Sequence, residues 1–156
     1  MKKIPLNDDM IVASALPIID YSDCFSTMVD VARFPDIDAF VRSYFLSQPR
    51  WLSAISTNIF SKNKMLAALE GNAFTEGDRV GGWKVYTRDA QEIVFGEHMG
   101  FMEYRFGLRL DDDKLRVATT VQYKGRFGRY YFALVRLLHQ KFVLRSLTYP
   151  QKEKKS

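Results

Sequence analysis

The stretch Phe101–Gln140, FMEYRFGLRLDDDKLRVATTVQYKGRFGRYYFALVRLLHQ, decides the fold because its apolar residues change period partway along. Up to Lys124 apolar and polar residues alternate, which is typical of a strand with one buried face. On one side lie Met102, Tyr104, Phe106, Leu108 and Leu110, and on the other Glu103, Arg105 and Arg109. The segment DDDK between the two alternating runs indicates a hairpin loop. This half therefore predicts two antiparallel strands with an apolar face and a charged face.

After the glycine at position 125 the apolar residues recur with helical spacing, which predicts a long helix to about Leu147. One stripe of this helix is expected to cover the apolar face of the sheet: Phe127, Tyr131, Leu134, Val135, Leu138 and Phe142. The flanks are apolar as well: Tyr130, Phe132, Leu137, Val143 and Leu144. We expect the helical region at 36–70 or a partner chain to cover part of these flanks.

Further strands are predicted upstream. In GGWKVYTRD and QEIVF the residues Trp83, Val85, Ile93 and Phe95 fall on the apolar side, which gives a meander of about four antiparallel strands. Residues 22–31 suit a first strand, and in a grip fold the last strand pairs with the first. We expect the charges on the polar side of the meander to pair across strands.

Two helices are expected between the first strand and the meander. Pro35 and Asp36 stand where a helix start favours them, and Pro49 opens a second helix. Gly71 marks the end of this helical region. The apolar residues of this second helix are Trp51, Leu52, Ile55, Ile59 and Phe60. The predicted class is α+β, a helix-grip in which a curved antiparallel sheet packs on a long C-terminal helix. We expect residues 1–150 to form one domain and residues 151–156 to be a basic, disordered tail.

Composition limits the function classes. With 47% hydrophobic residues among 156, the chain is not a disordered protein, and the single cysteine, Cys24, excludes an internal disulfide or a thiolate metal cluster. Asp8 and Asp9 precede the first apolar run and Pro17 closes it, so we expect no export signal. No apolar run reaches the length of a membrane span. We therefore expect a cytoplasmic protein in a reducing compartment.

The charge is unevenly distributed along the chain. Residues 114–149 contain eight Lys or Arg and no acid, whereas residues 4–113 contain ten Lys or Arg against seventeen acids, a net charge of −7. A nucleic-acid groove would explain the basic segment. We favour pairing with acids of the same domain, because much of the net charge of +5 comes from lysines at the two termini. No nucleic-acid partner is expected.

Several segments resemble the DUF2867 family, a set of small bacterial proteins without assigned activity. The resemblance rests on DRVGGWKVYTRDAQEIVFGEHMGFMEYRFGLRL, on VATTVQYKGRFGRYYFALVRLLHQ and more loosely on FPDIDAFVRSYFLSQPRWL. This family resembles the START and Bet v 1-like (SRPBCC) superfamily, which implies an apolar cavity between the sheet and the C-terminal helix. Relatives use such a cavity for lipids, sterols and polyketides.

The resemblance implies a set of cavity-lining residues. They are Trp83, Val85, Phe95, Met102, Tyr104, Tyr123, Tyr131, Leu138 and Phe142. Tyr104, Tyr131 and His139 would orient the ligand, although each apolar residue is also ordinary core material. No phosphate loop and no third metal ligand near His98 is visible, so no cofactor and no metal are expected.

Arg126 and Arg129 stand in the first turn of the long helix, where each opposes the helix dipole by about 0.3–1 kcal/mol. We expect at least one of them to be held by a carboxylate of Asp23, Asp30 or Glu97. The alternative is that they bind an anionic headgroup or carboxylate.

Three function classes stay open at this stage. The favoured one is binding of a small apolar or amphipathic ligand. The second is a cyclase or hydratase in which His139 acts as base and a tyrosine as acid. The third is an interaction module, such as a homodimer, that buries Tyr130, Phe132 or Leu144. The sequence names no ligand and no reaction.

Overall fold

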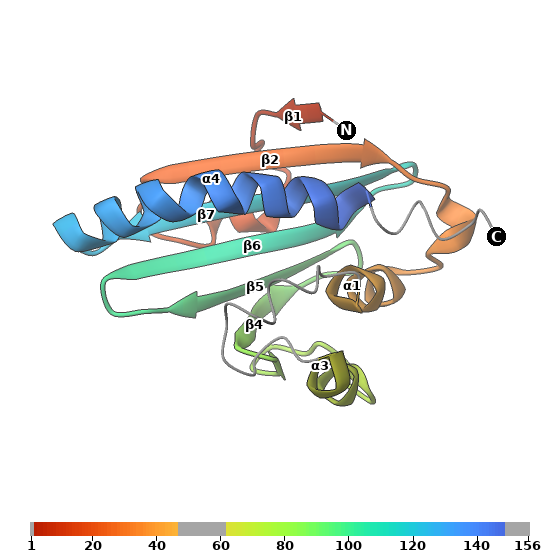
Figure 1. The fold of residues 1–156 in the computed structure, drawn as a ribbon. Helices are drawn as coiled ribbons and strands as arrows, with labels where there is room; N and C mark the ends of the chain where they lie inside the picture. Colours follow the sequence, from red (N-terminus) through yellow and green to blue (C-terminus); the bar gives the residue numbers. More distant parts are fainter. Residues whose placement is uncertain (1, 47–61, 149–156) are drawn as a thin grey trace.

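The computed structural model describes residues 2–46 and 62–148, and its centre is one antiparallel sheet (Figure 1). The strands follow the spatial order β1-β2-β7-β6-β5-β4-β3, and every neighbouring pair is antiparallel. Their bounds are β1 Lys2–Ile4, β2 Tyr21–Met28, β3 Arg79–Val80, β4 Trp83–Arg88, β5 Glu92–His98, β6 Met102–Leu110 and β7 Lys114–Tyr123.

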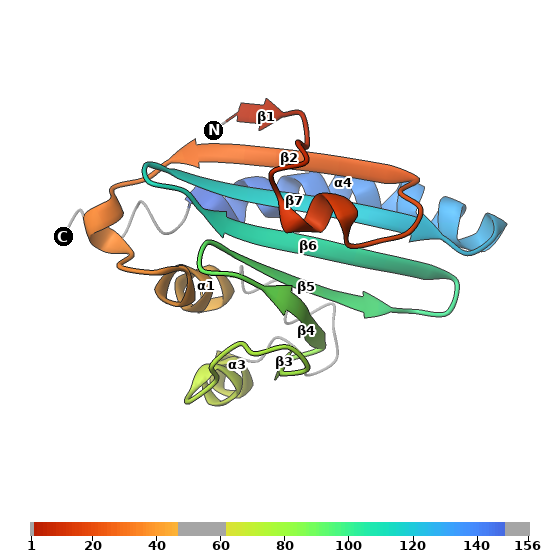
Figure 2. The same ribbon diagram turned by 180° about the vertical axis from the view of Figure 1, so that it is seen from behind.

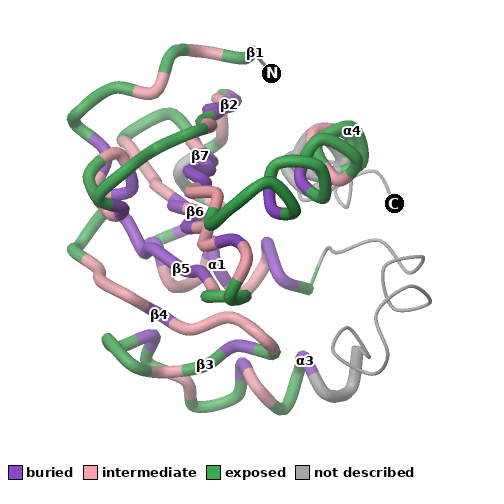
Figure 3. Tube along the Cα trace, turned by 90° about the vertical axis from the view of Figure 1, so that its left-hand side faces the viewer, coloured by how far each residue is buried: buried purple, intermediate pink, exposed green. Residues whose placement is uncertain are grey.

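The helices lie mainly on one face of this sheet. They are η1 Ile11–Ser14, η2 Val31–Arg33, α1 Ile37–Leu46, α3 Lys62–Leu69 and α4 Arg126–Thr148. The view from the side shows α1, α3 and α4 on one side of the strands (Figure 3), and the view from behind shows η1 across the other face (Figure 2). None of the described helices is both long and apolar enough to cross a membrane.

The α+β class and the meander are confirmed. Strands β4 to β7 follow one another, and the β6–β7 connection occupies residues 111–113, as the DDDK segment predicts. The pairing of β2 with β7 is also as expected, with Tyr21 opposite Val121 and Met28 opposite Lys114. The short strands β1 and β3 extend the sheet at its edges and were not predicted.

The main core lies between the sheet and the helices α1 and α3. Its fully buried members include Phe40, Phe45, Phe74, Ile93, Phe95, Leu108 and Leu115. Asp36 begins α1 as a cap, because its carboxylate Oδ1 accepts a hydrogen bond of 2.7 Å from the amide of Ala39. The expected second helix through Trp51 and Phe60 lies in residues 47–61, outside the described residues, and Gly71 follows the end of α3 with a positive φ of 67°.

The opposite face of the sheet carries a cover that alternation alone did not predict. Met10, Val12 and Leu16 are buried, and the segment around η1 lies over this face. Glu92, fully buried, accepts hydrogen bonds from the amides of Ile11 at 2.8 Å and of Val12 at 3.0 Å. Burial raises the pKa of Glu92, and the two amides lower it only in part.

A glycine makes room for this arrangement. A Cβ at Gly107 would lie 2.5 Å from Oε1 of Glu92 and 3.0 Å from the side chain of Val12. No side chain larger than hydrogen therefore fits at position 107 while the N-terminal segment stays in place.

An ion-pair network fixes the same segment from the side. The Arg116 guanidinium contacts Oδ2 of Asp9 at 2.7 Å and Oδ2 of Asp111 at 2.6 Å, and Nε of Arg109 lies 2.8 Å from Oδ1 of Asp111. Burial raises the pKa of Asp111, but hydrogen bonds from Arg116 and Arg109 outweigh it and lower the pKa overall. The expected pairing of charges across strands is confirmed for Arg109, which lies 3.6 Å from Glu92 on the neighbouring strand β5, whereas Arg116 pairs with Asp9 and Asp111, which lie outside the strands.

Helix α4 packs on β2 and β7, but not through the predicted stripe (Figure 1). Phe132 is 4% exposed and lies between the rings of Tyr21 and Tyr123, with centroids 4.8 Å and 5.9 Å away. A Cβ at Gly128 would lie 2.1 Å from the carbonyl oxygen of Phe101, so the helix backbone approaches the β5–β6 turn closely there.

The predicted stripe is therefore wrong as the packing face. Its members Phe127, Leu134 and Leu138 are exposed, and Leu134 is 73% exposed. The helix is rotated by about 80° from the predicted orientation, at 100° per residue. Since α4 is apolar on most sides, its periodicity could not decide between two stripes, and the close approach at Gly128 selects the observed one.

Candidate functional site

The residues predicted to line a cavity separate into core residues and surface residues. Val85, Phe95 and Met102 are buried, the first two completely, and they pack within the hydrophobic clusters of the sheet. These three side chains serve as core in this structure. The others lie nearer the surface.

Trp83 and Tyr104 form a hydrogen-bonded pair on the helix-bearing face of the sheet. Both are partly buried, and the indole Nε1–H of Trp83 donates to the Tyr104 hydroxyl over 2.8 Å. The Trp83 ring contacts Phe45 of α1 at 5.5 Å and Phe106 of β6 at 5.7 Å. The pair therefore joins the α1 core to the part of β6 that runs toward α4.

The Tyr104 phenol keeps its proton at neutral pH. Burial raises the pKa of Tyr104 to about 12, and the bond from Trp83 offsets only part of the rise. Because the hydroxyl accepts from Trp83, its own proton is left for a further acceptor. Among the described residues none accepts a hydrogen bond from it.

On the α4 side an aromatic cluster borders this pair. The ring of Phe101 packs edge-on against Phe127 at 4.9 Å and Tyr131 at 5.2 Å. Tyr131 is 37% exposed and Leu138 is 54% exposed, so neither is enclosed beneath the helix as predicted. Phe101 was not among the predicted residues, because it stands in a turn, outside the alternating pattern.

We name the surface formed by Trp83, Tyr104, Phe106, Phe101 and Tyr131 the aromatic surface. Its members come from β4, β6, the β5–β6 turn and α4, and all but Tyr131 are partly buried. The Tyr131 phenol lies near enough to Tyr104 to add to the rise in the pKa of Tyr104. The surface offers apolar area together with the phenol hydroxyls of Tyr104 and Tyr131.

Two predicted site residues cannot be placed. His139 and Phe142 lie within α4, but their side chains fall outside the described part of the chain. The predicted role of His139 as a base stays a prediction. Among the described residues no group of three His, Cys, Asp or Glu side chains is arranged to hold a metal ion.

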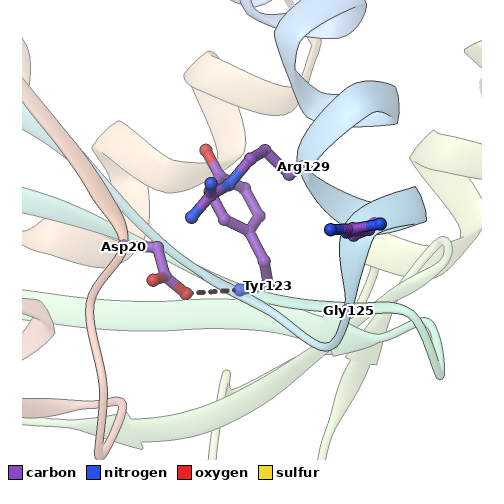
Figure 4. Close-up of a pocket in the computed structure, with 5 residues that line it drawn as sticks. Asp20, Tyr123, Gly125 and Arg129 are labelled. Carbon is purple, nitrogen blue, oxygen red and sulfur yellow. Dashed lines mark hydrogen bonds between the residues drawn. The ribbon is translucent and has the colours of Figure 1, made fainter.

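Arg126 and Arg129 line an open pocket of about 290 Å³ together with Asp20, Tyr123 and Gly125 (Figure 4). The Asp20 carboxylate accepts a hydrogen bond of 2.7 Å from the amide of Tyr123. Burial and the Asp20 charge raise the pKa of Tyr123, while the charges of Arg136 and Arg129 offset part of that rise.

The predicted ion pair of these arginines is wrong. In the described ranges no carboxylate lies within 4.0 Å of either guanidinium group. Asp23 instead accepts a hydrogen bond of 2.7 Å from the Tyr21 hydroxyl and is buried. The first turn of α4 lies at the end of β7 beside Asp20, a neighbour that the sequence pattern did not indicate.

A second charged cluster lies on the face of β6 opposite to that of Tyr104. Glu103 contacts Lys124 Nζ at 2.9 Å, His98 Nδ1 at 3.2 Å and the Arg105 guanidinium, which also stacks 3.4 Å above the Tyr86 ring. Burial raises the pKa of Glu103, but hydrogen bonds from these three neighbours bring it down to about 2. Arg105 lies on β6 itself, His98 ends the neighbouring strand β5 and Lys124 directly follows β7, so the cluster links neighbouring strands.

The comparisons with known proteins agree with this arrangement only at the level of the family. No curated protein and no solved structure matches the chain. One family model matches residues 15–146, which include every strand from β2 to β7 and nearly all of α4, and its description is a protein of unknown function, DUF2867. Since this match covers most of the 156 residues, the chain belongs to the DUF2867 family.

Proposed function

We propose that the protein binds a small apolar or amphipathic molecule at the aromatic surface. The observation that carries the proposal is the Tyr104 hydroxyl, which accepts from Trp83 and lies among partly buried aromatic rings. Ligand sites combine apolar walls with a few polar groups that fix orientation. The aromatic surface has this composition.

The chemistry of the site defines the kind of ligand. The rings of Trp83, Phe106 and Phe101 supply apolar area, and burial of such area contributes about 25 cal/mol per Å². The neutral Tyr104 phenol would donate to a carbonyl, carboxylate or hydroxyl oxygen of the ligand. An apolar body with one such oxygen fits both features.

The finer fold assignment belongs to this proposal. A helix-grip of the START and Bet v 1-like kind is supported by the chain order of β2, helices, meander and α4, and by the pairing of β2 with β7. In this chain α4 lies over β2 and β7, and Tyr131 and Leu138 are exposed on the flank of its packed side. A ligand would therefore lie beside α4, against Tyr131, rather than sealed beneath it.

Tryptophan fluorescence tests the proposal directly. Trp51→Phe leaves Trp83 as the only tryptophan, so its emission reports on the aromatic surface. Titration with a panel of fatty acids, sterols and aromatic polyketides should change the emission for at least one class and raise the melting temperature. If no member of the panel changes the emission and none raises the melting temperature, the proposal is refuted.

A matched pair of variants locates the site. Tyr104→Phe removes one hydrogen bond to the ligand and should weaken binding about 2- to 12-fold, corresponding to 0.5–1.5 kcal/mol. Tyr86→Phe makes the same chemical change on the other side of the sheet, where Tyr86 stacks with Arg105, and should leave binding unchanged. Equal effects of the two variants would contradict the proposed location.

A further inference from the structure

The side of α4 that points away from the sheet is apolar and basic at once. Arg126, Tyr130, Leu134, Leu137 and Lys141 fall within an arc of about 80°, roughly 170° from the buried positions Gly128 and Phe132. We name these five residues the outer face of α4. Figure 3 shows this helix at the surface of the molecule, with exposed residues on its outer side.

The outer face exposes more apolar area than ordinary surface positions do. Tyr130 is 73% exposed and Leu137 is 64% exposed, and Leu134 between them is as exposed as Tyr130. Phe127 adds a further exposed ring at the helix start. A contiguous apolar patch of this kind marks an interaction site.

The charges of this region define the partner. Residues 114–149 contain no acid, and within the described residues Arg126 and Arg129 have no carboxylate within 4.0 Å. Residues 4–113 carry seventeen acids against ten bases, a net charge of −7. A negatively charged partner would attract the α4 side and repel the rest of the molecule, so the charge distribution also sets an orientation.

A second copy of this chain fits these charges poorly. In a symmetric dimer the same patch meets itself, so antiparallel α4 helices would place Arg126 of one copy near Lys141 of the other. No acid on the helix would compensate this repulsion. The outer face is also the convex side of a single helix, which suits a flat, deformable surface.

We propose that the outer face of α4 docks on an anionic membrane surface, with the helix axis in the plane of the interface. Tyr130, Leu134 and Leu137 enter the boundary between headgroups and acyl chains, as in interfacial amphipathic helices. Arg126 and Lys141 reach the anionic headgroups from the same face. The pocket lined by Arg126, Arg129 and Tyr123, called the arginine pocket below, lies at the N-terminal end of α4, where Arg129 adds a further cation. This inference does not rest on ligand binding at the aromatic surface.

Vesicle flotation of the full chain tests the inference. The protein should float with vesicles of phosphatidylcholine that also contain phosphatidylglycerol, and not with phosphatidylcholine alone. Added salt should weaken the binding, because salt screens the charge attraction. No flotation with the anionic vesicles, or equal flotation with both kinds, overturns the inference.

Variants separate the outer face from other exposed apolar residues. Leu134→Glu should abolish flotation, whereas Ile18→Glu, at a residue 58% exposed before β2, should float like the wild type. Arg126→Gln and Arg129→Gln together should weaken binding about 25-fold, about fivefold for each cation lost. Circular dichroism confirms that each variant is folded, and Leu137→Gln provides a second outer-face change.

Two further measurements separate membrane docking from self-association and from ligand binding. Light scattering on the protein as it elutes from a size-exclusion column should show a monomer. A dimer that Leu134→Glu dissociates would assign the outer face to a second copy and overturn the membrane inference. Tyr104→Phe should leave flotation unchanged, so failure of ligand binding and failure of membrane docking are measured separately.

Discussion

Replacement of Gly128 by alanine distinguishes the effect of helix propensity from the effect of packing against neighbouring residues. In a helix interior alanine is favoured over glycine by about 1 kcal/mol, so α4 taken alone predicts stabilisation. In the folded protein the added Cβ would lie 2.1 Å from the carbonyl oxygen and 3.2 Å from the carbonyl carbon of Phe101. These are backbone atoms, so no side-chain rotation relieves the contact, and the structure predicts the opposite sign.

The size of the effect follows from the two opposing contributions. Overpacking costs about 1–3 kcal/mol, and a collision with backbone belongs at the upper end. After the gain in helix propensity, Gly128→Ala should lower the free energy of unfolding by about 2 kcal/mol. For a chain of this length the melting temperature should fall by about 4–8 °C.

Urea unfolding followed by far-ultraviolet circular dichroism measures this change. The matched control is Ala133→Gly, at an exposed position of the same helix, which should cost about 1 kcal/mol from propensity alone. If Ala133→Gly behaves as expected and Gly128→Ala is as stable as the wild type or more stable, the close approach of α4 to Phe101 is refuted.

Three further predictions concern stability. The pKa of Glu103 lies at about 2 in the folded chain, below its ordinary value of 4.5. Its contribution to the free energy of unfolding is therefore complete above pH 4.5 and is lost as the pH falls toward 2. Urea unfolding at several pH values should show this loss, and Glu103→Gln should remove that part of the pH dependence. Glu92→Gln should cost about 1–3 kcal/mol and speed amide hydrogen exchange in residues 10–16, and unchanged exchange there would contradict its role as anchor. Phe132→Ala should lower the free energy of unfolding by about 3–5 kcal/mol, while Leu134→Ala should change it by no more than about 0.5 kcal/mol in the same urea assay. The reverse order would contradict the orientation of α4 described above.

The strands could be predicted because one face of each is apolar. The alternation from Met102 to Leu110 has period 2, and a shift of one residue would turn every apolar side chain outward, so the pattern defines the faces. The pairing of β2 with β7 was also predicted, by comparison with grip folds, in which the last strand pairs with the first.

The orientation of α4 could not be predicted from periodicity. Leu134 and Leu138 are apolar residues like Phe132, and only the three-dimensional contact at Gly128 favours the face that contains Phe132. The partners of Arg126 and Arg129 depend on the same rotation. The predicted carboxylates belong to other positions on the sheet, and Asp20 lines the arginine pocket instead.

The cover on the second face of the sheet was also beyond the sequence pattern. Glu92 reads as a charged residue on a solvated face, yet it is fully buried because two backbone amides and the nearby Arg109 surround its carboxylate. The one sequence feature that indicated this cover is Gly107, which interrupts the series of polar residues on β6 and leaves space for the side chain of Val12.

The aromatic surface was predicted in part. Trp83, Tyr104 and Tyr131 were named as site residues, but Phe101 and Phe106 were not. The predicted enclosure of Leu138 beneath the helix was wrong. Ligand binding itself stays a prediction.

Cysteine reactivity along α4 tests most directly that this helix packs through Phe132 and leaves its outer face free. The native Cys24 is buried, and burial raises its pKa to about 11, so introduced cysteines report without interference. Tyr130→Cys and Leu134→Cys should react with a maleimide as fast as an unfolded control, whereas Phe132→Cys and Val135→Cys should react much more slowly. Fast reaction at 132 and 135 with protection at 130 and 134 would contradict the account.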